Sequence, residues 1–192
     1  MTDSSNGTEK LADRFRHVAE LDTTEQGPPV DQWDPAESGS LDLRIRRSGE
    51  WEYEGSPIQR WELVRLFSSI LKREGKDYFL VSPVEKLRIE VEDVPFIVHS
   101  LRVDGEGKDQ VLWFTTNVEQ TLPIGPEHPL EIREDAETGE PSPYVRIRRN
   151  LYGRIERNAF YHLVGMACEE DRDDGRHLGV YSQGQFYSLG RV

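Results

Sequence analysis

Apolar and charged residues alternate along residues 41–46 and again along residues 50–54. A period of two places successive side chains on opposite faces, which predicts two half-buried strands. A three-residue loop between them sets Ile45 opposite Trp51 and keeps apolar and charged side chains on separate faces, whereas a two-residue turn mixes them. We therefore predict a hairpin in this register, with Gly49 in the left-handed conformation that such a loop needs.

Apolar residues then recur at helical spacing between residues 59 and 73, which predicts an amphipathic helix that ends before Gly75. A mostly apolar run at 78–81 predicts a third strand. The turn that begins at Ser82 contains a proline, which presets the backbone for a tight turn. Alternation resumes along residues 86–91, so the turn joins the strands of a second hairpin.

The same order of elements recurs between residues 144 and 189. Arg-Ile-Arg-Arg begins at Arg44 and again at Arg146, and the helical pattern at 58–71 aligns with residues 155–168. Two copies are too few for a solenoid array. The duplication predicts an α+β fold of two halves, each built from a strand hairpin, a helix and a second strand hairpin.

The remaining segments connect or precede these copies. Residues 9–21 have the spacing of a short amphipathic helix, strands are predicted at 96–103 and 111–116, and proline-rich residues between 118 and 129 are the expected boundary. The predicted organisation is an acidic N-terminal arm at 1–30, a first half at 31–120 and a second half at 121–192.

Composition narrows the class of protein. The net charge of −12 argues against binding to long nucleic acid, which needs a basic surface. Residues 1–40 carry three basic and nine acidic side chains, so half of the excess lies in this segment. We find no signal peptide, lipidation motif or apolar run of membrane-spanning length, and one cysteine suits a reducing compartment. The expectation is a cytoplasmic protein without a membrane partner.

Several short motifs are distributed over both halves of the chain. They are Gly49-Glu50-Trp51, Tyr53, Gly55-Ser56-Pro57-Ile58, Leu63-Val64-Arg65-Leu66-Phe67, Val81-Ser82-Pro83-Val84-Glu85-Lys86, Phe114-Thr115-Thr116-Asn117, Gly125-Pro126, His128-Pro129-Leu130, Pro143-Tyr144-Val145 and Phe160-Tyr161. In these motifs the chain resembles the bacterial family known as domain of unknown function 1285. Where the family pattern has Asn-Pro-Pro and then Cys-Gly, this chain has Asp34-Pro35-Ala36 and Ser38-Gly39.

The resemblance implies a duplicated α+β core whose C-terminal half is loosely like a pleckstrin-homology domain. It implies no established activity. A nucleotide-like ligand between the halves and a signalling role are what the family suggests for this chain.

Arginines are the first candidates for ligand binding. Arg44 and Arg46 have predicted cross-strand partners in Glu52 and Glu50, so solvated ion pairs account for them. The second copy has no such acidic strand to answer Arg146 and Arg148. Planar guanidinium groups suit carboxylate or phosphate oxygens, although surface exposure alone would also explain these two.

Further candidates lie in turns and strand ends. Lys86 and Arg88 share a strand face beside Ser82, which suits either a phosphate cradle or a solvated face. Thr115 and Asn117 end a strand, where they suit either a polar ligand or a turn. The candidate ligand-binding residues are Ser82, Lys86, Arg88, Thr115, Asn117, Tyr144, Arg146 and Arg148.

Catalytic signals are weak. The five histidines are scattered without metal-ligand spacing, and Cys168 falls on the predicted second helix, where a buried thiol is the usual state. Gly105 and Gly107 precede a strand rather than a helix, so they do not form a dinucleotide loop. We expect no catalytic residue, no metal and no cofactor.

Three functional hypotheses follow. The first is a non-enzymatic binding module, a signalling sensor that holds a small anionic or nucleotide-like ligand between its halves. The second is a protein–protein adaptor that uses the acidic N-terminal arm and the 104–110 hairpin. The third is a hydrolase, which predicts titratable groups that converge at one site.

Overall fold

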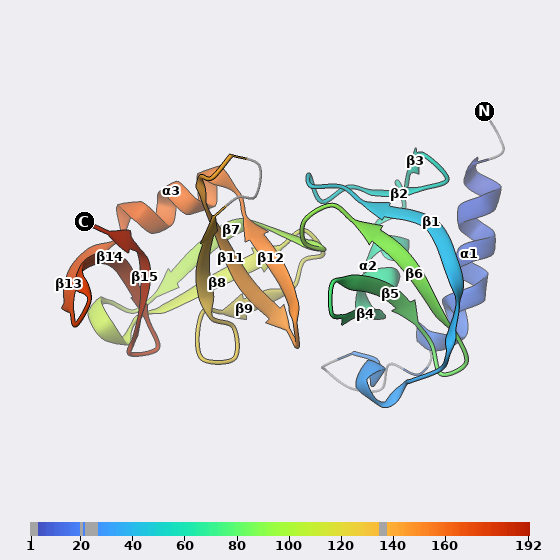
Figure 1. The fold of residues 1–192 in the computed structure, drawn as a ribbon, viewed down its shortest axis with the longest axis horizontal. Coiled ribbons are helices and arrows are strands. Elements are labelled where there is room, and N and C mark those ends of the chain that lie inside the picture. The colour runs from blue at the N-terminus through green and yellow to red at the C-terminus, as the bar shows by residue number, and fades with distance from the viewer. Residues whose placement is uncertain (1–3, 20, 22–26, 135–137) are drawn as a thin grey trace. The chain divides into compact units, whose positions relative to one another are not determined.

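The computed structural model divides the chain into two compact units, residues 1–95 and residues 96–192. Each unit mixes helices with parallel and antiparallel strands, so the α+β class is confirmed (Figure 1). The described residues are 4–19, 21, 27–134 and 138–192.

The first unit is built on one mixed sheet with the strand order β3-β2-β1-β6-β5-β4, in which β1 and β6 run parallel. In chain order its elements are α1 (Ser4–Ala19), the 3-10 helix η1 (Val30–Gln32), β1 (Glu37–Ile45), β2 (Trp51–Tyr53), β3 (Ser56–Pro57), α2 (Trp61–Ser69), β4 (Leu71–Glu74), β5 (Asp77–Val81) and β6 (Lys86–Val91).

The first hairpin has the predicted register. Ile45 lies opposite Trp51 and Leu43 opposite Tyr53, so these four side chains share one face and the charged side chains lie on the other. Gly49 has a φ of 88°, as the three-residue loop requires. Separation of apolar and charged faces was therefore sufficient to predict this pairing.

The predicted helix at 59–73 is too long. α2 ends at Ser69, and the chain then forms β4, in which Leu71 pairs with Leu80 of β5. Leu71 is fully buried. One buried residue at a helix-to-strand junction satisfies both the helical and the strand period, so periodicity alone could not locate the end of the helix.

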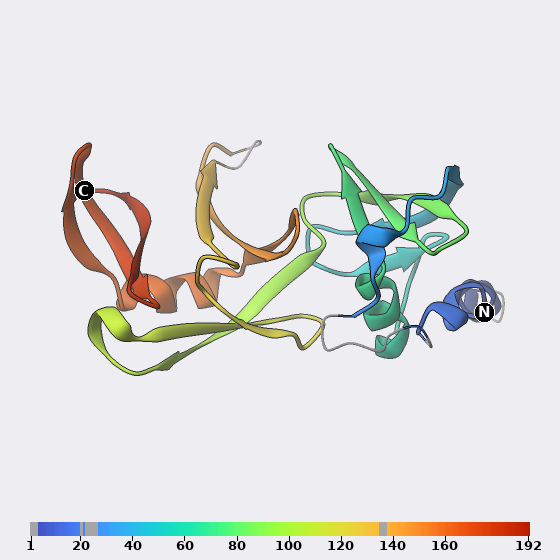
Figure 2. The same ribbon diagram turned by 90° about the horizontal axis from the view of Figure 1, so that it is seen from below.

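The N-terminal helix belongs to the core of the first unit. α1 buries Leu11, Phe15 and Val18, and the Phe15 ring meets the Phe67 ring of α2 edge-on at 6.2 Å. Figure 2 shows α1 and α2 on the same side of the sheet. The helix predicted at 9–21 is therefore present, and its apolar face is used inside the unit.

The second unit contains two sheets, with the strand orders β10-β11-β12-β7-β8-β9 and β13-β14-β15. Its elements in chain order are β7 (Phe96–Asp104), the 3-10 helix η2 (Gly107–Asp109), β8 (Val111–Thr116), β9 (Thr121–Pro123), β10 (Leu130–Glu134), β11 (Pro141–Arg148), β12 (Leu151–Ile155), α3 (Arg157–Gly165), β13 (Cys168–Arg172), β14 (Gly175–Ser182) and β15 (Gln185–Arg191).

Strand pairing places the division between units earlier in the chain than the expected boundary at 118–129. β7 runs parallel to β12, with Phe96 beside Gly153, so the hairpin that β7 forms with β8 belongs to the second unit. A parallel pair joins strands that are distant in the sequence, and local patterns carry no information about it. The compact units divide after Pro95 instead.

The two copies share their order of elements but not their sheet pairing. Leu80 pairs with Leu87 in β5–β6, and Val180 pairs with Tyr187 in β14–β15, so these hairpins share their register next to the turn. All strands of the first copy lie in one sheet, whereas β11 and β12 lie in one sheet and β13, β14 and β15 in another. The two copies are therefore alike in their hairpins and helices, but the strands of the two copies are arranged into sheets differently.

The helices of the two copies correspond one residue away from the sequence alignment. α2 and α3 have the same length. Aligning their first residues places Phe67 with Leu163 and Leu63 with Ala159, and all four residues are buried. Cys168 lies beyond α3, exposed at the start of β13. The prediction that Cys168 is a buried helical residue is therefore wrong, because α3, like α2, is shorter than its apolar pattern.

Replacement of Phe15 by alanine tests the packing of α1. We expect Phe15→Ala to lower the free energy of unfolding by about 3–5 kcal/mol, since it removes a fully buried ring and leaves a cavity beside Phe67. Urea denaturation followed by tryptophan fluorescence measures the loss. Lys10→Ala, on the exposed side of α1, serves as the control and should change stability little. A loss below about 1 kcal/mol for Phe15→Ala would contradict this packing.

Candidate functional site

Three cations share the polar face of the first unit's sheet. Lys72, Lys86 and Arg88 stand on β4 and β6, on either side of Phe79 in β5. The Lys86 Nζ atom lies 5.3 Å and the Arg88 Cζ atom 5.2 Å from the centre of the Phe79 ring. These contacts help to cover an aromatic side chain that lies on the polar side of the sheet yet is only 3% exposed.

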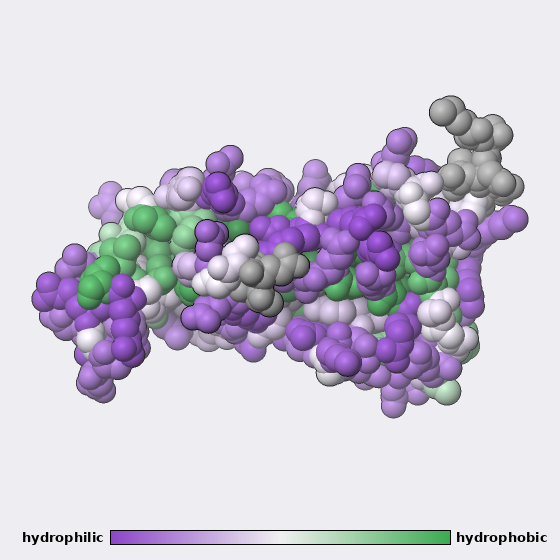
Figure 3. Space-filling model, turned by 45° about the horizontal axis from the view of Figure 1, so that its top comes forward, coloured by the Kyte–Doolittle hydropathy of each residue, from purple (hydrophilic) through white to green (hydrophobic). Residues whose placement is uncertain are grey.

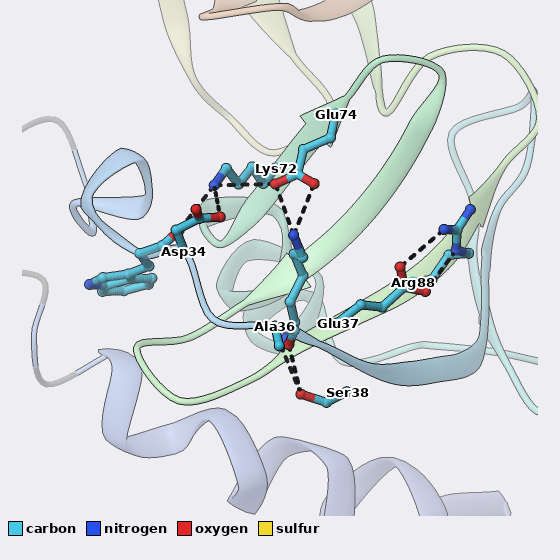
Figure 4. A network of polar contacts seen from close by, with 9 residues as sticks. Asp34, Ala36, Glu37, Ser38, Lys72, Glu74 and Arg88 are labelled. Carbon is cyan, nitrogen blue, oxygen red and sulfur yellow. Dashed lines mark hydrogen bonds and ion pairs between the residues drawn. The ribbon is translucent and has the colours of Figure 1, made fainter.

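Carboxylates of the same unit pair with these cations (Figure 4). Glu74 accepts hydrogen bonds from Lys86 at 2.9 Å and pairs with Lys72 at 3.3 Å. Arg88 pairs with Glu37 at 3.1 Å and with Asp77 at 2.8 Å. The hydrogen bond from Lys86 holds the pKa of Glu74 below its usual value, and the Arg88 hydrogen bond does the same to the pKa of Glu37.

The segment that departs from the family pattern joins the same network. The Lys72 ammonium donates to the Trp33 carbonyl at 3.0 Å. The Lys86 backbone N–H donates to Ser38 Oγ at 3.3 Å, and this hydroxyl donates to the Ala36 carbonyl. Figure 4 shows Ala36 and Ser38 beside the ion pairs. At the position where the pattern has a cysteine, Ser38 thus acts as a hydrogen-bonding link.

Ser82 stabilises its own turn. It is fully buried, and its hydroxyl oxygen accepts the backbone N–H of Glu85 at 3.2 Å. Its backbone N–H donates to the Glu85 carbonyl at 2.9 Å. Ser82 lies next to Lys86 and Arg88 in the sequence, but its hydroxyl serves the turn that carries them.

The partners predicted for two arginines are partly wrong. Arg44 pairs with Glu90 at 2.7 Å, and Arg46 pairs with Glu92 and Glu52, each at 2.8 Å. Glu90 lies in β6 and Glu92 follows directly after this strand, which runs parallel to β1. The predicted partner Glu52 is used by the neighbouring arginine, because the non-local strand supplies nearer carboxylates.

The second unit gathers arginines and tyrosines on one sheet face. Directly paired residues share a face, so the registers of β10, β11 and β12 place six side chains together. We refer to this set as the arginine–tyrosine face. It consists of Glu131, Arg133, Tyr144, Arg146, Tyr152 and Arg154.

Arg133 is held over two aromatic rings of the arginine–tyrosine face. Its Cζ atom lies 4.0 Å from the centre of the Tyr152 ring and 4.9 Å from that of Tyr144. Its guanidinium donates to Glu131 at 2.8 Å, and the Tyr152 hydroxyl donates to the same carboxylate at 3.3 Å. These contacts fix a planar cation on an aromatic surface.

Arg146 bonds to backbone carbonyls, and Arg148 lies over an aromatic ring. Arg146 donates to the carbonyls of Pro126 and Glu127, both at 3.1 Å. The Arg148 guanidinium lies over the Phe96 ring at 5.4 Å. Arg146 thus fastens the proline-rich segment to the sheet while it presents its charge on the arginine–tyrosine face.

Thr115 and Asn117 stabilise the end of β8. The Asn117 side-chain oxygen accepts the Ile97 backbone N–H at 3.0 Å, and the Asn117 N–H donates to the Ile97 carbonyl at 2.8 Å. The Thr115 hydroxyl bonds to that of Thr121 at 2.9 Å. Thr115 and Asn117 therefore serve strand pairing and turn formation. They are not part of the arginine–tyrosine face.

The 104–110 hairpin, proposed as an adaptor element, is docked within the second unit. The Gly184 N–H donates to the Lys108 carbonyl at 3.0 Å, and the Lys108 ammonium lies over the Tyr181 ring at 4.8 Å. Apolar surface is found elsewhere: Tyr161 is 62% and Val164 38% exposed on α3. Figure 3 shows apolar side chains gathered at the left of the view, over the region of α3.

One polar cluster was missed by sequence reasoning. His177 bonds to Ser188 across β14 and β15 and to Asp174 in the preceding turn. Sequence spacing gives no signal for it, because the serine reaches the histidine only through the pairing of two strands. In the part of the chain that the structure describes, no group of three or more histidine, cysteine, aspartate or glutamate side chains could hold a metal ion.

Membrane insertion by a helix finds no support among the described residues, since none of their helices has the length and apolarity needed to span a bilayer. The fold is therefore that of a two-unit α+β protein with ion-paired sheet faces. Models of the DUF1285 family match both parts: the N-terminal domain, of unknown function, at residues 28–94, and the C-terminal domain at residues 95–189. The chain belongs to the DUF1285 family.

Two solved structures are similar to the chain. A DUF1285 family protein from Silicibacter pomeroyi DSS-3 is 42% identical, with a TM-score of 0.83 over 93% of this chain and 95% of that one. A second, from Shewanella baltica OS155, is 26% identical, with a TM-score of 0.51 over 65% of this chain and 91% of that one. No curated protein matches the chain.

The ion pairs of Glu74 predict a pH dependence of stability. The pKa of Glu74 is lowered from 4.5 in the folded chain, so the stabilisation is present above the unfolded value and is lost as the pH falls through the folded value. We expect the wild type to be more stable than Glu74→Gln at neutral pH. The difference in free energy of unfolding should shrink once the pH falls below 4.5.

Urea denaturation at a series of pH values measures this difference. Glu50→Gln changes an exposed glutamate of the same unit and serves as the control, with a difference from wild type that stays small throughout. A Glu74→Gln difference that does not change between neutral and acid pH would show that the ion pairs do not stabilise the unit.

Proposed function

We propose that the chain is a binding module for a small anion and that the arginine–tyrosine face is the binding surface. The observation that carries this proposal is the composition of the face: three arginines and two tyrosines stand together on three paired strands. The whole chain has a net charge of −12, so a cluster of three guanidinium groups differs from its average composition. A local basic surface is sufficient to attract a small anion.

The polar face of the first unit is a weaker candidate. Its three cations are paired with Glu37, Glu74 and Asp77, and Lys72 also lies 3.7 Å from Asp34. An anion would have to displace carboxylates from all three of these cations. On the arginine–tyrosine face Arg133 is likewise paired, with Glu131 at 2.8 Å, whereas Arg146 donates to backbone carbonyls. Ser82, Lys86 and Arg88 are therefore assigned a structural role in this proposal, and Tyr144 and Arg146 a role in binding.

Nucleotide-like compounds match the chemistry of the arginine–tyrosine face. Guanidinium groups bind phosphate oxygens in pairs, and a guanidinium plane also stacks on flat rings. Arg133 is already held flat by Tyr144 and Tyr152, so little side-chain freedom is lost when a ligand binds. A signalling role and a likeness of the second unit to a pleckstrin-homology domain remain predictions that would suit such a ligand.

Replacement of Arg133 tests the surface. Purified protein is first screened by thermal shift with pyrophosphate and the common nucleotides, and each compound that raises the melting temperature is measured by calorimetry. We expect Arg133→Gln to weaken binding of such a compound about tenfold or more, since a charge-assisted hydrogen bond contributes about 1.5–3 kcal/mol.

Arg102→Gln is the matched control, because Arg102 also lies over an aromatic ring, that of Trp113, on a strand of the same unit. We expect the control to bind as the wild type does. The absence of binding by any of these compounds would overturn the proposal, and so would equal loss of affinity in both variants.

A further inference from the structure

Three polar side chains form a continuous hydrogen-bonded chain on the small sheet of the second unit. Ser188 Oγ lies 2.7 Å from His177 Nδ1, and His177 Nε2 lies 3.0 Å from Asp174 Oδ1. Arg191 donates to the other oxygen of Asp174 at 2.6 Å. The arrangement contains a hydroxyl, an imidazole and a carboxylate in the order that nucleophilic serines use, with the two ring nitrogens exchanged: the serine meets Nδ1 and the carboxylate meets Nε2.

The direction of each hydrogen bond follows from the groups present. An ionised carboxylate can only accept, so the imidazole places its proton on Nε2 and donates it to Asp174. In the neutral ring Nδ1 is then an acceptor, and the Ser188 hydroxyl must donate to it. The Arg191 hydrogen bond holds the pKa of Asp174 below its usual value, which keeps this carboxyl ionised.

Irregular strand pairing brings the serine to the histidine. Leu178 pairs with Gly190 and Gly179 with Ser188, so β15 contains one extra residue at this point. Such bulges re-aim side chains and are frequent beside active sites. Ser188 itself is half-buried, and the neighbouring Gly190 is exposed, with no atom within 4 Å of a Cβ atom built on it.

The first copy has different residues at the positions that correspond to His177 and Ser188. The hairpins β5–β6 and β14–β15 share their register from the turn as far as Phe79–Arg88 and Gly179–Ser188, and the extra residue of β15 lies beyond that point. Asp77 and His177 each lie two residues before the first member of these pairs. Asp77 and Arg88 form an ion pair at 2.8 Å. The Asp77–Arg88 ion pair of the first copy is thus replaced in the second by the His177–Ser188 hydrogen bond. An ion pair is sufficient for a polar contact at this position, so the imidazole and hydroxyl add chemical reactivity.

An aromatic ring adjoins the serine. Phe186 stands two residues before Ser188 on the same side of β15, and its ring meets that of Tyr181 edge-on at 5.2 Å. The ring lies against Gly179, where an added Cβ atom would come within 2.4 Å of it. A glycine at that position leaves room for the ring on the strand opposite the serine, and the Arg172 guanidinium lies over this ring at 5.6 Å.

We propose that Ser188 is a nucleophile for acyl transfer from small carboxylic esters, with His177 as its general base and Asp174 as the group that orients the ring. The Ser188 oxygen bonds to the ester carbonyl carbon while its proton moves to His177 Nδ1. The bond to the alcohol oxygen then breaks, and the alcohol leaves with that proton. Water hydrolyses the acyl-serine through the same histidine and releases the carboxylic acid.

A fluorophosphonate probe tests the reactivity of the serine on the full chain. We expect covalent labelling at Ser188. Mass spectrometry of the labelled wild-type protein locates the modified residue, so the assignment does not depend on the folding of any variant. His177→Gln should slow labelling about a hundredfold, in line with the contribution of a general base, and Asp174→Asn should slow it about tenfold or more.

Ser100→Ala is the matched control, because Ser100 is an exposed serine on a strand of the same unit. It should be labelled at the wild-type rate. With p-nitrophenyl butyrate we expect a burst of one equivalent of nitrophenol, which Ser188→Ala abolishes while circular dichroism shows that the variant is folded. Absence of label on Ser188 would overturn the proposal, as would an equal labelling rate in His177→Gln.

Discussion

Strand pairing between β5 and β6, and between β14 and β15, determines where the polar side chains of this protein can meet. Leu80 and Leu87 of the first hairpin, and Val180 and Tyr187 of the second, are buried cross-strand pairs, so a slip of one residue would turn these side chains to the other face. The register is therefore fixed by burial, and the polar face receives whatever residues the sequence places there. Asp77 meets Arg88 and His177 meets Ser188 for this reason, rather than through any attraction that selects them.

Burial also explains why the two copies carry different chemistry on the same frame. In the first copy Phe79 lies on the polar face and is covered by the stems of Lys86 and Arg88. In the second copy the corresponding position is Gly179, and the ring comes instead from Phe186. An aromatic ring with a cation over it is kept in both copies, but the cations come from β6 in the first and from Arg172 of β13 in the second. Duplicated sheets can thus change their polar groups without a change of register.

The sequence predicted the first hairpin and its register, because the pattern separated apolar from charged residues and Gly49 allowed the loop. It failed at the ends of α2 and α3, where buried residues such as Leu71 satisfy a helical and a strand period alike. Tyr144 and Arg146 were predicted, but Arg133 and Arg154 were not. These two stand on β10 and β12, and only the pairing of those strands with β11 brings them together.

The parallel pairing of β7 with β12 has a consequence for the growing polypeptide. Residues up to Pro95 contain every strand of the first sheet, so that unit can fold while the rest of the chain is still being translated. The second unit must wait, since Phe96 is made at its start and its neighbour Gly153 more than fifty residues later. Until then one edge of β7 is open, and the nascent chain exposes an unpaired strand that chaperones would recognise.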